Sequence, residues 1–159
     1  MKHQTDTKEQ QPLSIIGWRE LLDLPQLGIV DIKAKIDTGA RTSALHAFHV
    51  KELKKDGKKM IHFQVHPYQK DKHNIVTAEA ELLEWRNVKD SGGHQQYRPV
   101  ILTPVELGGQ PWNIELTLTN RDVMGFRMLL GREAVRQRFL VDPGGSFLLS
   151  EQKKTKVKK

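Results

Sequence analysis

Cysteine is absent from the 159-residue chain, and other features that would fix a function class are missing as well. Without cysteine there is no thiol nucleophile, no disulfide and no zinc site with thiolate ligands. No apolar run approaches the roughly 18 residues of a membrane-spanning helix, and the N-terminus lacks the apolar core of a signal peptide. We therefore expect a soluble cytoplasmic protein.

The familiar motifs of several enzyme classes are also missing. The chain has no Gly-x-x-x-x-Gly-Lys-Ser/Thr phosphate loop, no Gly-x-Gly-x-x-Gly, no His-Glu-x-x-His and no Gly-x-Ser-x-Gly. The sequence therefore contains no motif that would support nucleotide hydrolysis, a zinc peptidase with its ligands on a helix, or a serine hydrolase with its nucleophile at a strand-to-helix turn.

The positive charge is modest once the two ends are set aside. The formal charge is +7; residues 151–159 carry five lysines against one glutamate, residues 1–12 balance two against two, and +3 is left for the rest. This charge fits an acidic partner without requiring nucleic acid, and an aromatic content of 6% weakens an RNA-binding interpretation. We expect one domain at residues 13–150 between polar tails at 1–12 and 151–159.

Alternation of apolar and polar residues indicates half-buried strands at residues 30–36, 61–65, 76–82 and 112–119. In the last of these, Thr117 and Thr119 are expected on the outer face. The predicted inward faces are Val30, Ile32, Ala34 and Ile36; Ile61, Phe63 and Val65; Val76, Ala78, Ala80 and Leu82; and Trp112, Ile114, Leu116 and Leu118.

Glycine-rich turns separate these strands, at Asp56-Gly57, Gly92-Gly93, Gly108-Gly109 and Pro143-Gly144-Gly145. One short helix is expected, from about Arg132 to Arg138. Closely spaced short strands with such turns favour an all-β barrel or sandwich.

Seven histidines raise the question of a metal site. On a strand, His62 and His66 would share a face but lie about 13 Å apart, too far to ligate one ion together, and His46 and His49 would point to opposite faces. Surface histidines are the preferred interpretation, although a site built from distant segments stays open. We expect no cofactor.

Two segments remain that could carry chemistry: Asp37-Thr38-Gly39 at the end of an apolar strand, and MLLGREAV at residues 128–135. An acid, a hydroxyl residue and a glycine suit a tight turn, where a glycine amide can donate to the carboxylate. Alone, this tripeptide is a weak signal. The two segments together, about ninety residues apart, resemble the retropepsin-like aspartic peptidases.

The stretches DTGARTSALHA, ELTLTNRDVMGFRMLLGREAV and FLVDP are similar to those of a bacterial subgroup that carries the name ATP-dependent zinc proteases and is associated with ATP-grasp glutamate ligases. The resemblance implies a closed retropepsin-like β-barrel, and a peptidase that trims glutamate added by such a ligase. Neither zinc nor ATP has a supporting motif here. The resemblance implies catalytic roles for Asp37, Thr38 and Gly39, and a structural motif of Leu129, Leu130, Gly131 and Arg132.

Aspartic peptidase chemistry needs two carboxylates that share one proton, and this chain has one Asp-Thr-Gly. A homodimer that brings two copies of Asp37 together is the economical hypothesis. Residues 89–98 are the first candidate for a flap over the substrate, and residues 51–59 are the second. The substrate-binding candidates are Ala40, Arg41, Thr42, Ser43, Arg98 and Arg121.

Two other functions are compatible with the sequence. One is a metal-dependent hydrolase on the same fold that uses Asp37 with His46 and another histidine. The other is a non-catalytic barrel that binds an acidic protein, a ribosomal surface or RNA through its lysine-rich hairpin at residues 51–59 and its C-terminal tail.

Overall fold

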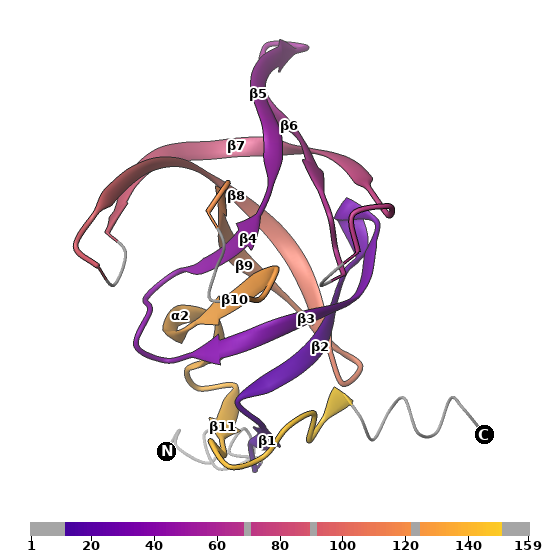
Figure 1. The fold of residues 1–159 in the computed structure, drawn as a ribbon, viewed down its shortest axis with the longest axis vertical. Coiled ribbons are helices and arrows are strands. Elements are labelled where there is room, and N and C mark those ends of the chain that lie inside the picture. The colour runs from indigo at the N-terminus through magenta and orange to yellow at the C-terminus, as the bar shows by residue number, and fades with distance from the viewer. Residues whose placement is uncertain (1–11, 69–70, 90–91, 122–124, 151–159) are drawn as a thin grey trace, which may run out of the picture.

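The computed structural model describes residues 12–68, 71–89, 92–121 and 125–150, and one strongly curved sheet dominates it (Figure 1). The predicted tails lie almost wholly outside this range. No helix within the described part is long and apolar enough to cross a membrane. The elements are β1 (Ser14–Ile16), β2 (Arg19–Leu24), the 3-10 helix η1 (Pro25–Leu27), β3 (Ile29–Asp37), β4 (Ser43–His46), β5 (Phe48–Lys55), β6 (Lys58–Val65), β7 (Val76–Lys89), β8 (Gln95–Leu107), β9 (Gln110–Thr119), β10 (Met128–Gly131), α2 (Arg132–Val135) and β11 (Phe139–Val141).

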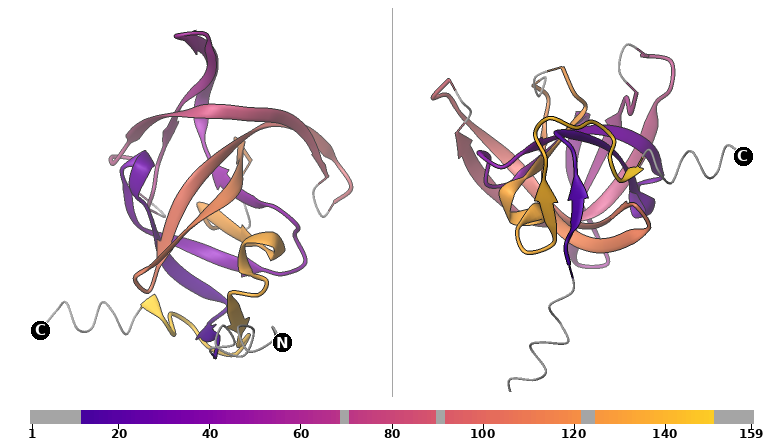
Figure 2. Two further views of the ribbon diagram at one scale, coloured as in Figure 1. Left: turned by 180° about the vertical axis from the view of Figure 1, so that it is seen from behind. Right: turned by 90° about the horizontal axis from the view of Figure 1, so that it is seen from below.

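The main sheet has the strand order β2-β3-β10-β4-β9-β8-β7-β6-β5. One further pair, Asp23 with Glu106, joins β2 to β8, so that six strands form a ring whose closure rests on one residue pair. The remaining strands β7, β6 and β5 continue outward, and the β5–β6 hairpin projects from the body of the molecule (Figures 1 and 2). The expectation of a mainly β fold with a short helix is confirmed, but the barrel is only partly closed.

The core lies inside this curved sheet, where the alternating strands place their apolar faces. The predicted inward residues of segments 61–65, 76–82 and 112–118 all belong to the core cluster or pack against it. Burial of these side chains stabilises the fold by about 25 cal/mol for each Å² of apolar surface removed from water.

Strand β3 departs from the predicted alternation at its start. Val30, predicted to face inward, is 55% exposed, and its neighbour Ile29 is buried instead. The reason lies in Asp31, which takes a left-handed backbone conformation with φ 58° and donates its amide to Asp23 Oδ1 at 2.9 Å. This irregularity shifts the register before Ile32, from which point the predicted alternation holds.

Strand β9 departs from the prediction at its other end. Thr117 and Thr119 are buried rather than solvent-facing. The Arg98 guanidinium donates to Thr117 Oγ1 at 3.4 Å, and Thr119 Oγ1 donates to Gln96 Oε1 at 2.7 Å. The outer face of β9 is therefore covered by polar side chains of its neighbour β8.

The helix starts where the sequence predicted but is shorter. α2 ends at Val135, because Arg136 is extended with φ −59° and ψ 139°, and Gln137 has a positive φ of 64°. The turn at residues 143–145 follows β11 and bends the chain back toward β2, where the amide of Trp18 donates to the carbonyl of Gly145 at 2.8 Å.

Glu20 on β2 fastens the C-terminal segment to the sheet. Its carboxylate is fully buried and accepts hydrogen bonds from the amides of Gly17, Leu148, Leu149 and Ser150, and from the Ser150 hydroxyl. We call this arrangement the Glu20 clasp. A buried charge needs such complete pairing, because an unpaired carboxylate away from water is strongly unfavourable.

Candidate active site

Asp37 is the last residue of β3, and the turn that follows it fixes its carboxylate. Asp37 Oδ1 accepts the amides of Gly39 at 3.0 Å and Ala40 at 3.2 Å. The acid is half-buried, whereas Thr38 and Gly39 are exposed. No hydrogen bond to Asp37 Oδ2 is formed by the described residues, so the turn holds one carboxylate oxygen and not the other.

Strand β10 lies between β3 and β4, and its last residue packs against the turn that follows Asp37. Gly131 lies beside Asp37 in the parallel register with β3, and its amide donates to Ser43 Oγ at 3.0 Å. A Cβ on Gly131 would lie 2.7 Å from the carbonyl carbon of Thr42 and 2.9 Å from the carbonyl oxygen of Ala40. Only glycine allows this close approach of the two chain segments.

The start of α2 adds three further bonds to the same loop. The amides of Arg132 and Glu133 donate to the carbonyls of Ala40 and Arg41, at 2.7 and 3.1 Å. The Arg132 side chain donates from Nη1 to the Thr38 carbonyl at 2.9 Å. Of the four residues singled out from the sequence as a structural motif, Gly131 and Arg132 therefore contact the Asp37 loop, whereas Leu129 and Leu130 pair with Lys35 and Ile36 of β3.

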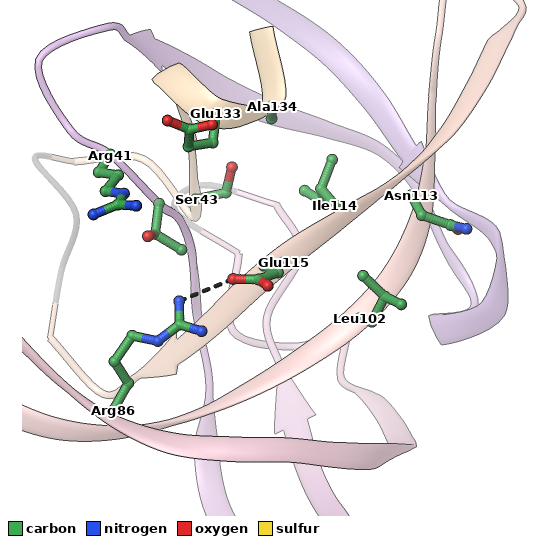
Figure 3. Close-up of a pocket in the computed structure, with 10 residues that line it drawn as sticks. Arg41, Ser43, Arg86, Leu102, Asn113, Ile114, Glu115, Glu133 and Ala134 are labelled. Carbon is green, nitrogen blue, oxygen red and sulfur yellow. Dashed lines mark hydrogen bonds and ion pairs between the residues drawn. The ribbon is translucent and has the colours of Figure 1, made fainter. Parts of the chain in front are cut away.

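A pocket of about 570 Å³ opens beside the later residues of this loop, 41–43, which form part of its lining (Figure 3). It does not include the Asp37 carboxylate. Arg86 of β7 points across it toward Glu115 of β9, while Glu133 of α2 forms the opposite wall. Its lining comprises Arg41, Thr42, Ser43, Arg86, Leu102, Asn113, Ile114, Glu115, Glu133 and Ala134.

Arg86 is a fixed cation in this pocket. It donates to Glu84 Oε2 at 2.7 Å and to Glu115 Oε1 at 2.9 Å. Burial alone would lower the pKa of Arg86, but the two carboxylates raise it above its ordinary value, so the guanidinium stays charged. By contrast, the Arg41 side chain forms no hydrogen bond or ion pair with the residues that the structure describes.

The substrate-binding candidates separate into two groups. Arg41, Thr42 and Ser43 line the pocket, whereas Ala40, Arg98 and Arg121 do not. Arg98 is only 7% exposed and donates to Gln96 Oε1 at 2.8 Å, and Arg121 is exposed after the end of β9. Sequence reasoning missed Arg86 and Glu115, because their meeting depends on the pairing of β7 with β8 and of β8 with β9.

The two flap candidates are both hairpin ends. Residues 89–98 span the turn between β7 and β8, of which 90 and 91 lie outside the described residues. Residues 51–59 form the exposed turn between β5 and β6. In Figure 1 the end of β7 and the start of β8 lie on the same side of the molecule as the end of β3.

No three His, Asp or Glu side chains in the described ranges come together in a group that could hold an ion. His49 and His66 instead lie against the Phe48 ring, with centroid distances of 4.9 and 4.6 Å.

Known proteins resemble this chain in sequence and in fold. The chain matches the family described as retropepsin-like aspartic endopeptidase RimB over residues 15–152. A crystal structure of a Legionella pneumophila protein of unknown function (DUF785) superposes with a TM-score of 0.68, at 31% identity, over 86% of this chain and 98% of the other.

Longer relatives are also found. A protein named probable alpha-L-glutamate ligase from Shewanella halifaxensis is 46% identical over 143 residues, which is 90% of this chain and 31% of that protein. One of the same name from Parasynechococcus marenigrum is 48% identical over 137 residues, 86% of this chain and 29% of that protein. The chain thus spans about a third of the length of these relatives. From its fold, its Asp37 loop and this match, the chain belongs to the retropepsin-like aspartic endopeptidase family of the RimB type.

Proposed function

We propose that the protein is an aspartic endopeptidase in which Asp37 is the catalytic acid, and that the active form is a homodimer. The observation that carries this proposal is the Asp37 carboxylate: one oxygen is held by two amides and the other has no partner among the described residues. Thr38 and Gly39 stand exposed beside it, where a second copy of the loop could meet them.

The chemistry follows from two such acids close together. Like charges about 3 Å apart cannot both be ionised, so two copies of Asp37 would share one proton. The ionised acid activates a water molecule, and the protonated acid polarises the scissile carbonyl. A two-fold axis through the loop generates this pair without a second motif in the chain. Thr38 would hydrogen-bond across the axis, and Gly39 would allow the two backbones to approach.

We further propose that the substrate is a chain of glutamate residues added to a protein or peptide by an ATP-grasp glutamate ligase. Support comes from the longer relatives, whose printed name is alpha-L-glutamate ligase and which contain a region similar to this chain. Two functions joined in one polypeptide often act on the same material. Arg41 is a suitable contact for a substrate carboxylate, since a guanidinium can bind it through two parallel hydrogen bonds.

The test is cleavage of a glutamate-tailed peptide, followed by mass spectrometry, together with sedimentation velocity at the assay concentration. Asp37→Asn should abolish cleavage, and the matched variant Asp71→Asn should leave it unchanged. An active monomer would overturn the dimer, and cleavage that survives Asp37→Asn would overturn the catalytic assignment.

Two controls separate the alternative functions. A metal-dependent hydrolase would lose activity to a chelator, whereas the carboxylate pair should keep it. A non-catalytic binding protein would depend on the exposed lysines of residues 51–59, and their neutralisation should leave peptidase activity intact if the proposal holds.

A further inference from the structure

Strand β5 forms one edge of the main sheet, and its outer side is open. It comes last in the strand order, after β6, and within the described part of the chain no strand pairs with its other side. From Lys51 to Lys55 it pairs with β6 without irregularity. In Figure 1 this hairpin projects from the body of the molecule. The backbone N–H and C=O groups on the open side of β5 are therefore available to a further strand.

Lysines occupy the last two residue pairs of this hairpin. Lys54 lies directly opposite Lys59, and Lys55 lies opposite Lys58. All four side chains are exposed. Like charges placed opposite each other destabilise an antiparallel pair, so this arrangement does not serve the stability of the hairpin. Lysines on an edge prevent a second copy of the same edge from pairing with it, but they attract a strand of opposite charge.

Acidic side chains of the protein neutralise little of this charge. Lys55 Nζ donates to Glu79 Oε1 at 2.7 Å, in a pair that is open to solvent. The carboxylate of Glu52, on the same strand, instead accepts the indole N–H of Trp85 at 2.9 Å. The other lysines of residues 51–59 form no ion pair with the residues that the structure describes. The open edge therefore keeps most of its positive charge.

The lysines lie on both faces of the hairpin. Neighbouring residues of a strand point to opposite faces, and directly paired residues share a face. Lys54 and Lys59 therefore lie on one face, and Lys55 and Lys58 lie on the other. An extended chain made of acidic residues also points its side chains alternately to the two faces. Such a chain, laid along β5, would meet cations on each face.

We propose that the open edge of β5 is a second binding surface for the substrate, where an acidic chain adds to the sheet as a further strand. This inference rests on the proposed function, in which the substrate is a chain of glutamates, and it locates the binding of the part that lies away from the cleaved bond. Backbone hydrogen bonds hold the added chain, and the lysines select acidic side chains.

One chain can occupy both the edge and the Asp37 loop. β4 begins at Ser43, just after that loop, and Ala47 alone separates β4 from β5. Lys51 and Lys55 lie eight and twelve residues beyond Ser43, which at about 3.3 Å per residue is at most about 26 and 40 Å. A chain of about 20 glutamates is long enough to contact both places. Cleavage of a peptide too short to reach the edge does not depend on it.

The binding test uses the Asp37→Asn protein, which leaves the probe uncut, and fluorescence anisotropy with a labelled chain of about 20 glutamates. Lys54→Glu should weaken binding about threefold to tenfold, because it replaces an attraction by a repulsion. The introduced carboxylate would lie opposite Lys59, so the hairpin should not lose stability. Lys72→Glu is the matched control, since Lys72 is exposed between β6 and β7, and it should change the affinity less than about twofold.

Hydrogen exchange followed by mass spectrometry tests the added strand directly. Binding of the same chain should slow exchange of the outward amides of residues 51–55 at least about tenfold, since they gain hydrogen-bond partners. Two peptides of about 21 residues, repeats of Glu-Glu-Ala and of Glu-Glu-Pro, carry equal charge. Proline has no N–H to donate to a ladder, so the second peptide should bind more weakly and leave this exchange unchanged.

The outcomes separate this surface from the peptidase assignment. If no peptide is cleaved but the acidic chain binds through Lys54 and slows exchange in β5, the peptidase assignment falls and the binding surface stands. If cleavage depends on Asp37 but Lys54→Glu weakens binding no more than Lys72→Glu, or exchange at residues 51–55 does not change, the binding surface is wrong and the peptidase assignment stands.

Discussion

Glu20 and Asp37 lie on neighbouring strands, and their carboxylates are placed in opposite ways. Glu20 is fully buried and both of its oxygens accept hydrogen bonds, from four amides and one hydroxyl. Asp37 is half-buried and only Oδ1 accepts, from two amides. A carboxylate whose hydrogen bonds are all made within the fold stabilises it, whereas one that is oriented but left incomplete is available for chemistry.

The largest effect is expected for Asp37→Asn. Peptidase activity should fall by at least about a thousandfold, because an amide cannot share the proton that the mechanism requires. The melting temperature should change by no more than about 2 °C, since the turn amides can still donate to the side-chain carbonyl. Activity assays and calorimetry on one preparation measure both quantities, and a large loss of stability would contradict the contrast with Glu20.

Glu20→Gln should have the reverse result. The amide nitrogen of glutamine would face backbone amides that need an acceptor, so the free energy of unfolding should fall by about 2–4 kcal/mol. Activity per folded molecule should stay close to that of the parent. Urea denaturation followed by tryptophan fluorescence checks the first value, and unchanged stability would show that the Glu20 clasp is not structural.

Gly131→Ala connects the two regions, because it disturbs the support of the Asp37 loop without touching a carboxylate. The added methyl group would lie 2.7 Å from the backbone of Thr42. We expect a loss of about 1–3 kcal/mol in stability together with reduced activity. Gly144→Ala is the matched control, since its nearest atom is 3.5 Å away. Equal behaviour of the two variants would remove the argument for close packing beneath the loop.

Asp71 should give the smallest effect. It repeats the turn geometry of Asp37, with Oδ1 accepting the amides of His73 at 2.8 Å and Asn74 at 3.3 Å. These amides, His73 foremost, and the Asn74 side chain lower the pKa of Asp71. Its stabilising contribution is therefore present above the unfolded pKa of about 3.9 and lost as the pH falls through the folded pKa.

Denaturation of the parent and of Asp71→Asn at several pH values checks this. The two proteins should differ slightly at pH 7, and the difference should vanish in strong acid. A difference that grows in acid would mean that the assigned direction of the pKa is wrong.

The contrast between Asp37 and Glu20 can be predicted from the sequence only in part. The turn residues after Asp37 and the glycine before Arg132 are local signals, and the structure places them together as the resemblance implied. The role of Glu20 carries no local signal, because its partners Leu148 and Ser150 lie 128 and 130 residues away. The same limit applies to Arg86, whose contact with Glu115 depends on the pairing of β7 with β8 and of β8 with β9.

The outer face of β9 shows a second limit of sequence reasoning. Alternation predicts which residues share a face, but it does not say whether another element covers that face. Thr117 and Thr119 follow the alternation and are nevertheless buried, because side chains from β8 lie over them. The prediction for Val30 is wrong for a different reason. Asp31 takes a left-handed backbone conformation, and this reverses the faces of the residues before it.

The position of β10 between β3 and β4 has a consequence for the newly made protein. Thr38 and its support Arg132 are separated by 94 residues. At a synthesis rate of about 5–20 residues per second, about 5–20 s pass between the synthesis of the Asp37 loop and that of the segment that holds it in place. During that time the nascent chain carries Asp37 without the strand and helix that hold its loop, so the catalytic role proposed for Asp37 requires that β10 and α2 have been made.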